Sequence, residues 1–184
     1  MPFFKEFHTR YPNVHIKVAN QTSIACAKML ENGQVDFILT NYPNSSLSNA
    51  NSIRTLREFS DVFVANARSF PLNGRKVSLQ ELQEHPILML DRKSTTSEFL
   101  HQMFQKNQLD LVPEIELTSN DLLIDLARIG LGIAFVPDFC IPKDDPELFV
   151  LDLEEELPRR QIVVACNESL PISQAAKQFM EMLH

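Results

Sequence analysis

Hydrophobic positions along the chain follow two alternating patterns. Apolar residues at every second position predict a half-buried strand, and apolar residues three or four positions apart predict the buried face of a helix. The segment 14–18 shows the first pattern, and the segment that begins at Thr22 or Ser23 shows the second. Further strands are expected at 35–39, 61–65, 87–90, 114–117, 133–136, 148–153 and 161–165.

Capping residues, glycine and proline mark where the predicted helices begin and end. Ser78–Glu81 and Thr95–Glu98 each have the pattern of a capping box, in which a hydroxyl accepts a hydrogen bond from a backbone amide at the helix start. The expected helices are one that stops before Tyr11, one from Thr22 or Ser23 to Asn32, one from Ser78 to His85, one from Thr95 to Lys106, one from Ser119 or Asn120 to Gly130, and one from about Ser173 to the end.

The order of these elements predicts the fold class. Strands alternate with helices almost throughout, and the segments 41–51 and 67–77, which contain Pro, Asn, Ser or Gly, are expected to be irregular. Such alternation implies βαβ units. We therefore expect an α/β fold with mostly parallel sheets and helices on both faces.

Composition and charge narrow the classes of protein that remain. The chain has 184 residues, 44% hydrophobic and 22% charged, which is ordinary for a globular protein. Its net charge is -7 and its 17 Lys and Arg residues are scattered, so a surface that tracks nucleic-acid phosphates is not expected. No apolar run approaches the about 20 residues that span a bilayer. The N-terminus lacks the pattern of a signal peptide, which predicts a cytoplasmic protein.

Residues that could carry chemistry do not form a catalytic or metal-binding motif. Cys26, Cys140 and Cys166 lack metal-binding spacing, and their odd number argues against a disulfide framework. The only glycine motif is Gly130-Leu131-Gly132, which follows a helix rather than a strand, and the acidic run 154–156 fits a solvated face. No catalytic residue, metal or cofactor is expected.

Polar residues recur instead at the start of helices that follow strands. They occur at 21–23, at 94–96 and at 119–120. Each group could simply cap its helix. Together they could form a ligand site, because helix N-termini offer free amides and partial positive charge, which suit carboxylates and other anions. Arg92 and Lys93 could add charge or could be solvated loop residues.

Four motifs in order resemble the effector-binding domain of LysR-type transcriptional regulators. Residues 7–14 are similar to the family's F-x-x-x-Y-P-x-V, and 30–39 to its L-x-x-G-x-x-D-x-x-(I/L). Residues 77–87 resemble (V/I)-S-L-x-D-L followed by P-(L/I), and 130–137 resemble G-x-G-(I/V)-x-x-(L/V)-P. The final amphipathic helix also fits, so that the resemblance covers nearly the whole chain.

The resemblance implies a two-lobed fold like that of type II periplasmic binding proteins, with a small effector bound between the lobes. The first lobe would comprise 1–66 and 167–184 and the second 67–166, with crossings near 62–66 and 162–166. Carried over by position, the effector contacts are expected at Gln21, Thr22, Ser23, Thr40, Asn41, Ser94, Thr95, Thr96, Ser119, Asn120, Phe135, Val136 and Pro137.

The family also implies partners. Its members pair as homodimers, often as tetramers, and bind DNA through an N-terminal winged helix-turn-helix with a linker helix. Because the resemblance starts at the first helix of the effector domain, those parts and the domain's first strand are expected to precede Met1. One local departure is Asn20-Gln21, which replaces the family's usual glycine before Thr22.

The sequence therefore predicts an effector-sensing domain that binds a small, anionic metabolite and is not an enzyme. One alternative is the solute-binding protein of a transporter, which shares the fold and which a secretion signal would favour. A second alternative is an enzyme on a related two-lobed fold. A titratable cluster facing the cleft would favour the enzyme, whereas the candidate residues are neutral hydroxyls and amides.

Overall fold

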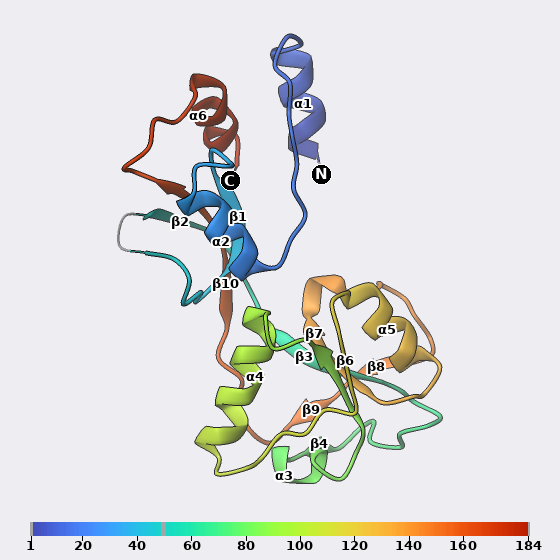
Figure 1. Ribbon diagram of the computed structural model, residues 1–184. Helices are drawn as coiled ribbons and strands as arrows, with labels where there is room; N and C mark the ends of the chain where they lie inside the picture. The colour runs from blue at the N-terminus through green and yellow to red at the C-terminus, as the bar shows by residue number, and fades with distance from the viewer. Residues whose placement is uncertain (1, 49–50, 184) are drawn as a thin grey trace. The chain divides into compact units, whose positions relative to one another are not determined.

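The structure of the chain, a computed structural model, describes residues 2–48 and 51–183 and divides into two compact units (Figure 1). The first unit comprises Met1–Glu58 and Gln161–His184, and the second comprises Phe59–Arg160. The chain thus crosses between units after Glu58 and after Arg160. Both crossings come a few residues before the segments 62–66 and 162–166, near which the crossings were predicted.

Strand pairing explains the shifted boundaries. Strand β3 (Asp61–Asn66) pairs with strands β7 (Ile133–Pro137) and β8 (Leu148–Val150), which belong to the second unit. Strand β10 (Arg160–Asn167) pairs with strand β1 (Ile38–Tyr42) in the first unit. Each crossing therefore lies where a strand enters its own sheet.

The first unit is a small sheet with three helices. Its strands have the order β1-β10-β2, with β2 at Asn51–Phe59 and with β1 antiparallel to β10. The helices are α1 (Pro2–Arg10), α2 (Ser23–Glu31) and α6 (Gln174–Glu181). Helices α1 and α6 meet through Phe7 and Phe179, whose ring centroids lie 4.9 Å apart, while Ala27 and Leu30 of α2 pack with Ile38 and Ala165 of the sheet.

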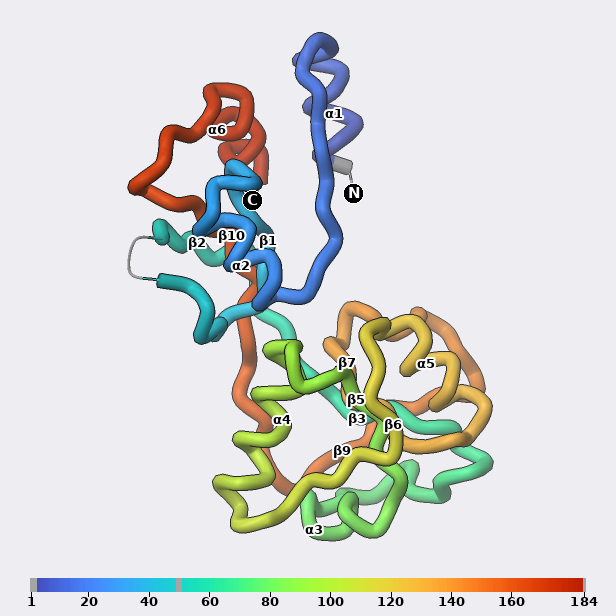
Figure 2. The backbone as a smooth tube through the Cα atoms, in the orientation of Figure 1, coloured from blue at the N-terminus to red at the C-terminus, as the bar shows by residue number. Residues whose placement is uncertain are grey.

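Two predictions for this unit are wrong, and one strand was missed. The segment 14–18 forms no strand: it runs as extended chain between α1 and α2 (Figure 2), and Val18 is 65% exposed. Alternating apolar residues favour a strand only where a partner strand supplies the other half of the hydrogen bonds. Strand β1 begins three residues after the predicted position 35, and β2 was not predicted. Residues 49 and 50 of the predicted loop lie outside the described residues.

The second unit contains a five-stranded sheet of order β6-β5-β7-β3-β8. Strands β5 (Ile87–Leu90), β6 (Ile115–Leu117) and β7 are parallel, as predicted. Strands β3 and β8 are antiparallel to their neighbours, which corrects the expectation of mostly parallel pairing. Two short strands, β4 (Lys76–Val77) and β9 (Asp152–Leu153), form a separate parallel pair within segments predicted as a loop and as one longer strand.

Helices cover both faces of this sheet, as predicted (Figure 1). Helices α3 (Leu79–Leu82) and α4 (Thr95–Lys106) pack against Phe63 and Phe135 on one face. Helix α5 (Asn120–Arg128) packs against Val64 and Val136 on the other. Because successive strand residues point to opposite faces, each strand supplies both cores, and a 3₁₀ turn at Asp138–Cys140 follows β7.

Helix caps confirm the predicted cap Ser78 and correct the predicted cap Thr95; the Glu81 carboxylate binds Arg75 instead of completing a capping box. Ser78 caps α3, where its hydroxyl accepts a hydrogen bond from the Glu81 amide at 3.1 Å, although the helix ends at Leu82 rather than His85. At α4 the cap is Ser94 instead of Thr95: the Ser94 hydroxyl accepts from the Ser97 amide at 3.0 Å. The Thr95 hydroxyl is engaged elsewhere, as described below.

Candidate functional site

The start of α2 carries the first group of predicted site residues. Thr22 caps this helix, since its hydroxyl accepts a hydrogen bond from the Ala25 amide at 3.3 Å. Gln21 is exposed, and its carbonyl accepts a hydrogen bond from the Cys26 thiol. Burial raises the pKa of the Cys26 thiol, which therefore stays protonated near neutral pH. The simple capping role is thus established for Thr22.

Asn44, which sequence reasoning missed, joins Ser23 to Thr40. Its side-chain amide donates to the Ser23 carbonyl at 3.1 Å and to the Thr40 hydroxyl at 3.2 Å, and only 5% of the residue is exposed. We call Ser23, Thr40 and Asn44 the Asn44 cluster. It ties the first turn of α2 to strand β1, and the predicted residue Asn41 follows Thr40 in that strand, half-buried. In the sequence Asn44 is indistinguishable from the other Asn and Ser residues of its loop.

A second polar cluster surrounds Arg160 in the second unit. The Arg160 guanidinium donates to the Asp61 carboxylate at 2.8 Å, to the Thr96 hydroxyl at 3.2 Å and to the Thr95 hydroxyl at 2.9 Å. Arg160 is 1% exposed, and its partners are buried as well. We call Asp61, Thr95, Thr96 and Arg160 the Arg160 cluster. It gives the two threonines a specific partner that no sequence pattern indicated.

Aromatic rings enclose this guanidinium. Its central carbon lies 5.4 Å from the centroid of the Phe59 ring and 5.2 Å from that of the Phe99 ring, within the range of cation–π attraction. Burial raises the pKa of the Asp61 carboxyl, and the charge of Arg160 acts in the opposite direction. The Nε of Arg160 and one carboxylate oxygen of Asp61 are buried without a hydrogen-bond partner within the described part of the chain. A desolvated ion pair is thus built into the start of α4.

The third predicted group lies at the start of α5. Ser119 caps that helix, with its hydroxyl accepting from the Leu122 amide at 3.3 Å. The side-chain oxygen of Asn120 is buried and has no hydrogen-bond partner among residues 2–48 and 51–183. The unpaired oxygen of Asn120 therefore lies next to the cap residue Ser119 in the chain. The Ser119 side chain itself is exposed.

The last predicted contacts, Phe135, Val136 and Pro137, are buried residues of β7. The Phe135 ring packs on that of Phe63, with centroids 4.7 Å apart, and Val136 belongs to the opposite core. In this structure the Phe135 side chain is therefore a core element. Pro137 lies opposite Asp61 in the ladder between β7 and β3, next to the Arg160 cluster.

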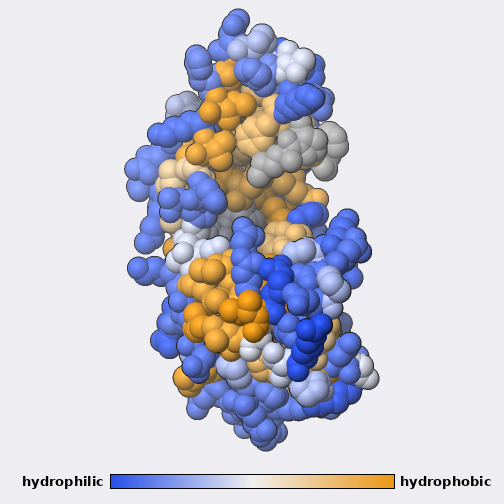
Figure 3. Space-filling model, turned by 90° about the vertical axis from the view of Figure 1, so that its right-hand side faces the viewer, coloured by the Kyte–Doolittle hydropathy of each residue, from blue (hydrophilic) through white to orange (hydrophobic). Residues whose placement is uncertain are grey.

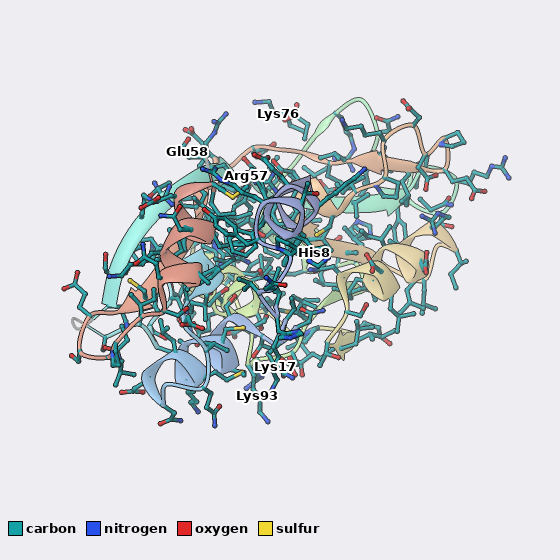
Figure 4. The ribbon with its side chains drawn as sticks, turned by 90° about the horizontal axis from the view of Figure 1, so that it is seen from above. His8, Lys17, Arg57, Glu58, Lys76 and Lys93 are labelled. Carbon is teal, nitrogen blue, oxygen red and sulfur yellow. The ribbon has the colours of Figure 1, made fainter. Side chains whose placement is uncertain are left out.

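The two basic residues before α4 are exposed and belong to neither polar cluster. Arg92 lies 3.8 Å from the carboxylate of Glu116, and Lys93 projects outward in Figure 4. The structure also has a surface cavity of about 710 Å³ in the second unit, lined by residues such as Arg68, Arg128 and Asp145. None of the predicted site residues lines it, and Arg128 is paired with Asp145 at 2.8 Å.

Across 2–48 and 51–183, no group of three or more His, Cys, Asp or Glu side chains could hold a metal ion. No helix in the same part of the chain is long and apolar enough to cross a membrane.

Comparisons with known proteins give consistent matches. The family described as the LysR substrate binding domain matches residues 1–184. The transcriptional activator CmpR of Synechocystis sp. is 25% identical over 180 residues, which are 97% of this chain and 59% of CmpR. The regulator TtuA of Agrobacterium vitis is 27% identical over 139 residues, 74% of this chain and 45% of TtuA. The chain thus spans about half the length of these relatives.

Solved structures share the fold. The regulatory domain of CcmR from Synechocystis PCC6803, in complex with 2-PG, superposes with a TM-score of 0.88 at 19% identity, covering 99% of this chain and 88% of that one. The effector-binding domain of QuiR, in complex with shikimate, superposes with a TM-score of 0.81 at 16% identity, covering 98% and 86%. Both chains are bound to small molecules, and at these identities the likeness concerns the fold.

Proposed function

The chain belongs to the LysR substrate binding domain family, and on that premise we propose that it senses a small-molecule effector for a transcriptional regulator. The observation that carries the proposal is that predicted contact residues are gathered into two polar clusters next to the starts of α2 and α4. Ser23 and Thr40 meet at Asn44, and Thr95 and Thr96 meet at Arg160. Catalysis is not part of the proposed role.

The proposed contact groups favour an anionic effector. The first turn of a helix has amides without intrahelical acceptors and a partial positive charge, and a single cap satisfies only one of those amides. Thr22 and Ser94 each cap one amide of α2 and α4. A carboxylate or phosphate could accept from the amides that remain. Shikimate, which QuiR binds, is a carboxylate of this kind.

The direct experiment is a binding titration of the 184-residue chain. Calorimetry and thermal shift would be measured with a panel of small carboxylates and phosphates that includes 2-PG and shikimate, with uncharged analogues of the same size as controls. We expect at least one anion to bind and to raise the melting temperature, and its uncharged analogue to bind at least about tenfold more weakly. If uncharged analogues bind as well as anions, the proposed chemistry is wrong.

We propose a second copy of the chain as the protein partner. Leu122 lies on α5, and Ile129 is the residue at the C-terminal cap of that helix; the two are 47% and 73% exposed. Figure 3 shows hydrophobic side chains gathered on the face of the second unit that carries α5. An apolar helix face that remains in water marks an interaction surface.

Replacing Ile129 with aspartate tests this surface. A charge at the centre of an apolar contact is left desolvated, so we expect the dimer dissociation constant, measured by analytical ultracentrifugation, to rise by at least about tenfold. Val112→Asp is the matched control, because Val112 is 84% exposed and lies on another segment. If Ile129→Asp dimerises like Val112→Asp, the α5 face is not the interface.

The regulator's remaining functions follow from the family. DNA binding would reside in the part of such a regulator that is outside this domain, and the effector would shift the population of its conformations by binding one of them more tightly. A regulator of this kind would act in the cytoplasm, where the DNA that it binds is located. The transporter alternative is less well supported, because the relatives named above are regulators of transcription.

A further inference from the structure

Arg160 occupies a special place in the path of the chain. It is the last residue of the second unit, and Phe59, whose ring lies over its guanidinium, is the first. Its ion-pair partner Asp61 is two residues further along, at the start of β3. The Arg160 cluster therefore contains residues from both points where the chain passes between the units.

The same guanidinium holds the first turn of α4. Its two terminal nitrogens reach the hydroxyls of Thr95 and Thr96, the first two residues of that helix. The Phe99 ring, one turn further along α4, lies on the guanidinium as well. One side chain thus joins the start of α4 to both crossing points.

We propose that Arg160 is a coupling residue that transmits displacement of the first turn of α4 to both crossing segments. Arginine suits this task because its planar fork binds several oxygen atoms at fixed angles, which a lysine ammonium does not do. Full burial makes the arrangement stiff, since no water can replace a lost partner. A displaced threonine hydroxyl would pull on the guanidinium and hence on Asp61.

Stability alone does not account for a buried ion pair. Desolvation of two charges offsets most of their attraction, and apolar residues of similar volume often stabilise a fold equally well. What the pair does supply is a defined geometry between segments distant in sequence. The regulatory meaning rests on the proposed function: effector contact at the start of α4 would be the event that is transmitted.

Hydrogen–deuterium exchange tests the coupling without an effector. The double variant Thr95→Val/Thr96→Val removes both hydroxyls at nearly constant volume. We expect it to raise exchange in residues 59–62 and 159–162 by about tenfold in the otherwise unchanged chain, because charged hydrogen bonds are lost. In a background of Asp61→Leu/Arg160→Met, where the connection is already absent, the same change should raise exchange there less than twofold.

Several controls make the result decisive. Ser119→Ala removes a cap from the same unit but outside the cluster, and should leave residues 59–62 unchanged. If the leucine–methionine background does not fold, Arg160→Lys serves instead, because it keeps the charge and loses the fork. An equal rise in both backgrounds, or no rise in the unchanged chain, overturns the coupling. A failed effector titration would count against the proposed function only, since exchange is measured without ligand.

Discussion

Replacing Arg160 with methionine is expected to lower the free energy of unfolding by about 3–5 kcal/mol, the typical cost of removing one partner of a buried ion pair. The large cost arises because Asp61 stays buried with its charge and without a cation. Thr95 and Thr96 also lose their donor. Urea unfolding of the 184-residue chain, followed by circular dichroism, measures the change.

Two further observations separate this explanation from a general packing defect. The double variant Asp61→Leu/Arg160→Met should recover most of the lost stability, because neither charge is then buried alone. The difference in unfolding free energy between the unchanged chain and Arg160→Met should also become smaller as the pH falls from 7 to 5. Without the cation, the folded-state pKa of Asp61 rises further above its unfolded value, so that protonation stabilises the folded variant as the pH falls. A deficit independent of pH would contradict the unpaired carboxylate.

Phe135→Ala is expected to cost about 3–5 kcal/mol of unfolding free energy, as for other buried aromatic residues replaced by alanine. Phe135 is fully buried, and its ring packs on Phe63 and stacks with Phe99 at a centroid distance of 6.4 Å. Its loss would open a cavity between the sheet and α4. Chemical denaturation again measures the change.

Phe135→Leu is the matched control for this position. It keeps much of the buried volume and should cost roughly half as much or less. If the ring only packs the core, this variant should bind a panel anion with unchanged affinity once folded. A tenfold loss of affinity without loss of structure would instead restore the sequence-based prediction that the Phe135 side chain contacts the effector.

Local sequence patterns correctly predicted features that depend on nearby residues, such as helix caps. Ser78 caps α3 as expected, and α2 is capped by Thr22, one of the two residues expected there, because a hydroxyl placed before a helix accepts from an amide three residues on. The two-sided core of the second sheet also follows from its uninterrupted apolar strand 133–136. Such features depend on neighbours within a few residues.

Features that depend on distant partners could not be predicted from the sequence. Arg160 and Asp61 are 99 positions apart, and neither belongs to a motif. Thr95 was expected to cap its helix, yet Ser94 does so, because the Thr95 hydroxyl is bound by Arg160. In the segment 14–18 the local pattern is present but the distant partner is not. Apolar residues alternate with polar ones there, yet no strand forms, because no partner strand pairs with the segment.

The division between the two units shows the same limit. The family resemblance indicated two crossings, but their positions depend on which sheet each strand joins. Strand β3 joins the second sheet through β7 and β8, and β10 joins the first through β1. The expected placement of the effector between two lobes stays a prediction.

The most direct test of the proposed sensor role is a nuclear magnetic resonance titration of the ¹⁵N-labelled chain with 2-PG, shikimate and the other anions of the panel. For at least one anion, we predict that the largest and saturable amide shifts fall in the first turns of α2 and α4, at residues 23–26 and 95–98. No saturable shift with any anion, or shifts confined to surfaces away from both helix starts, would contradict the proposal.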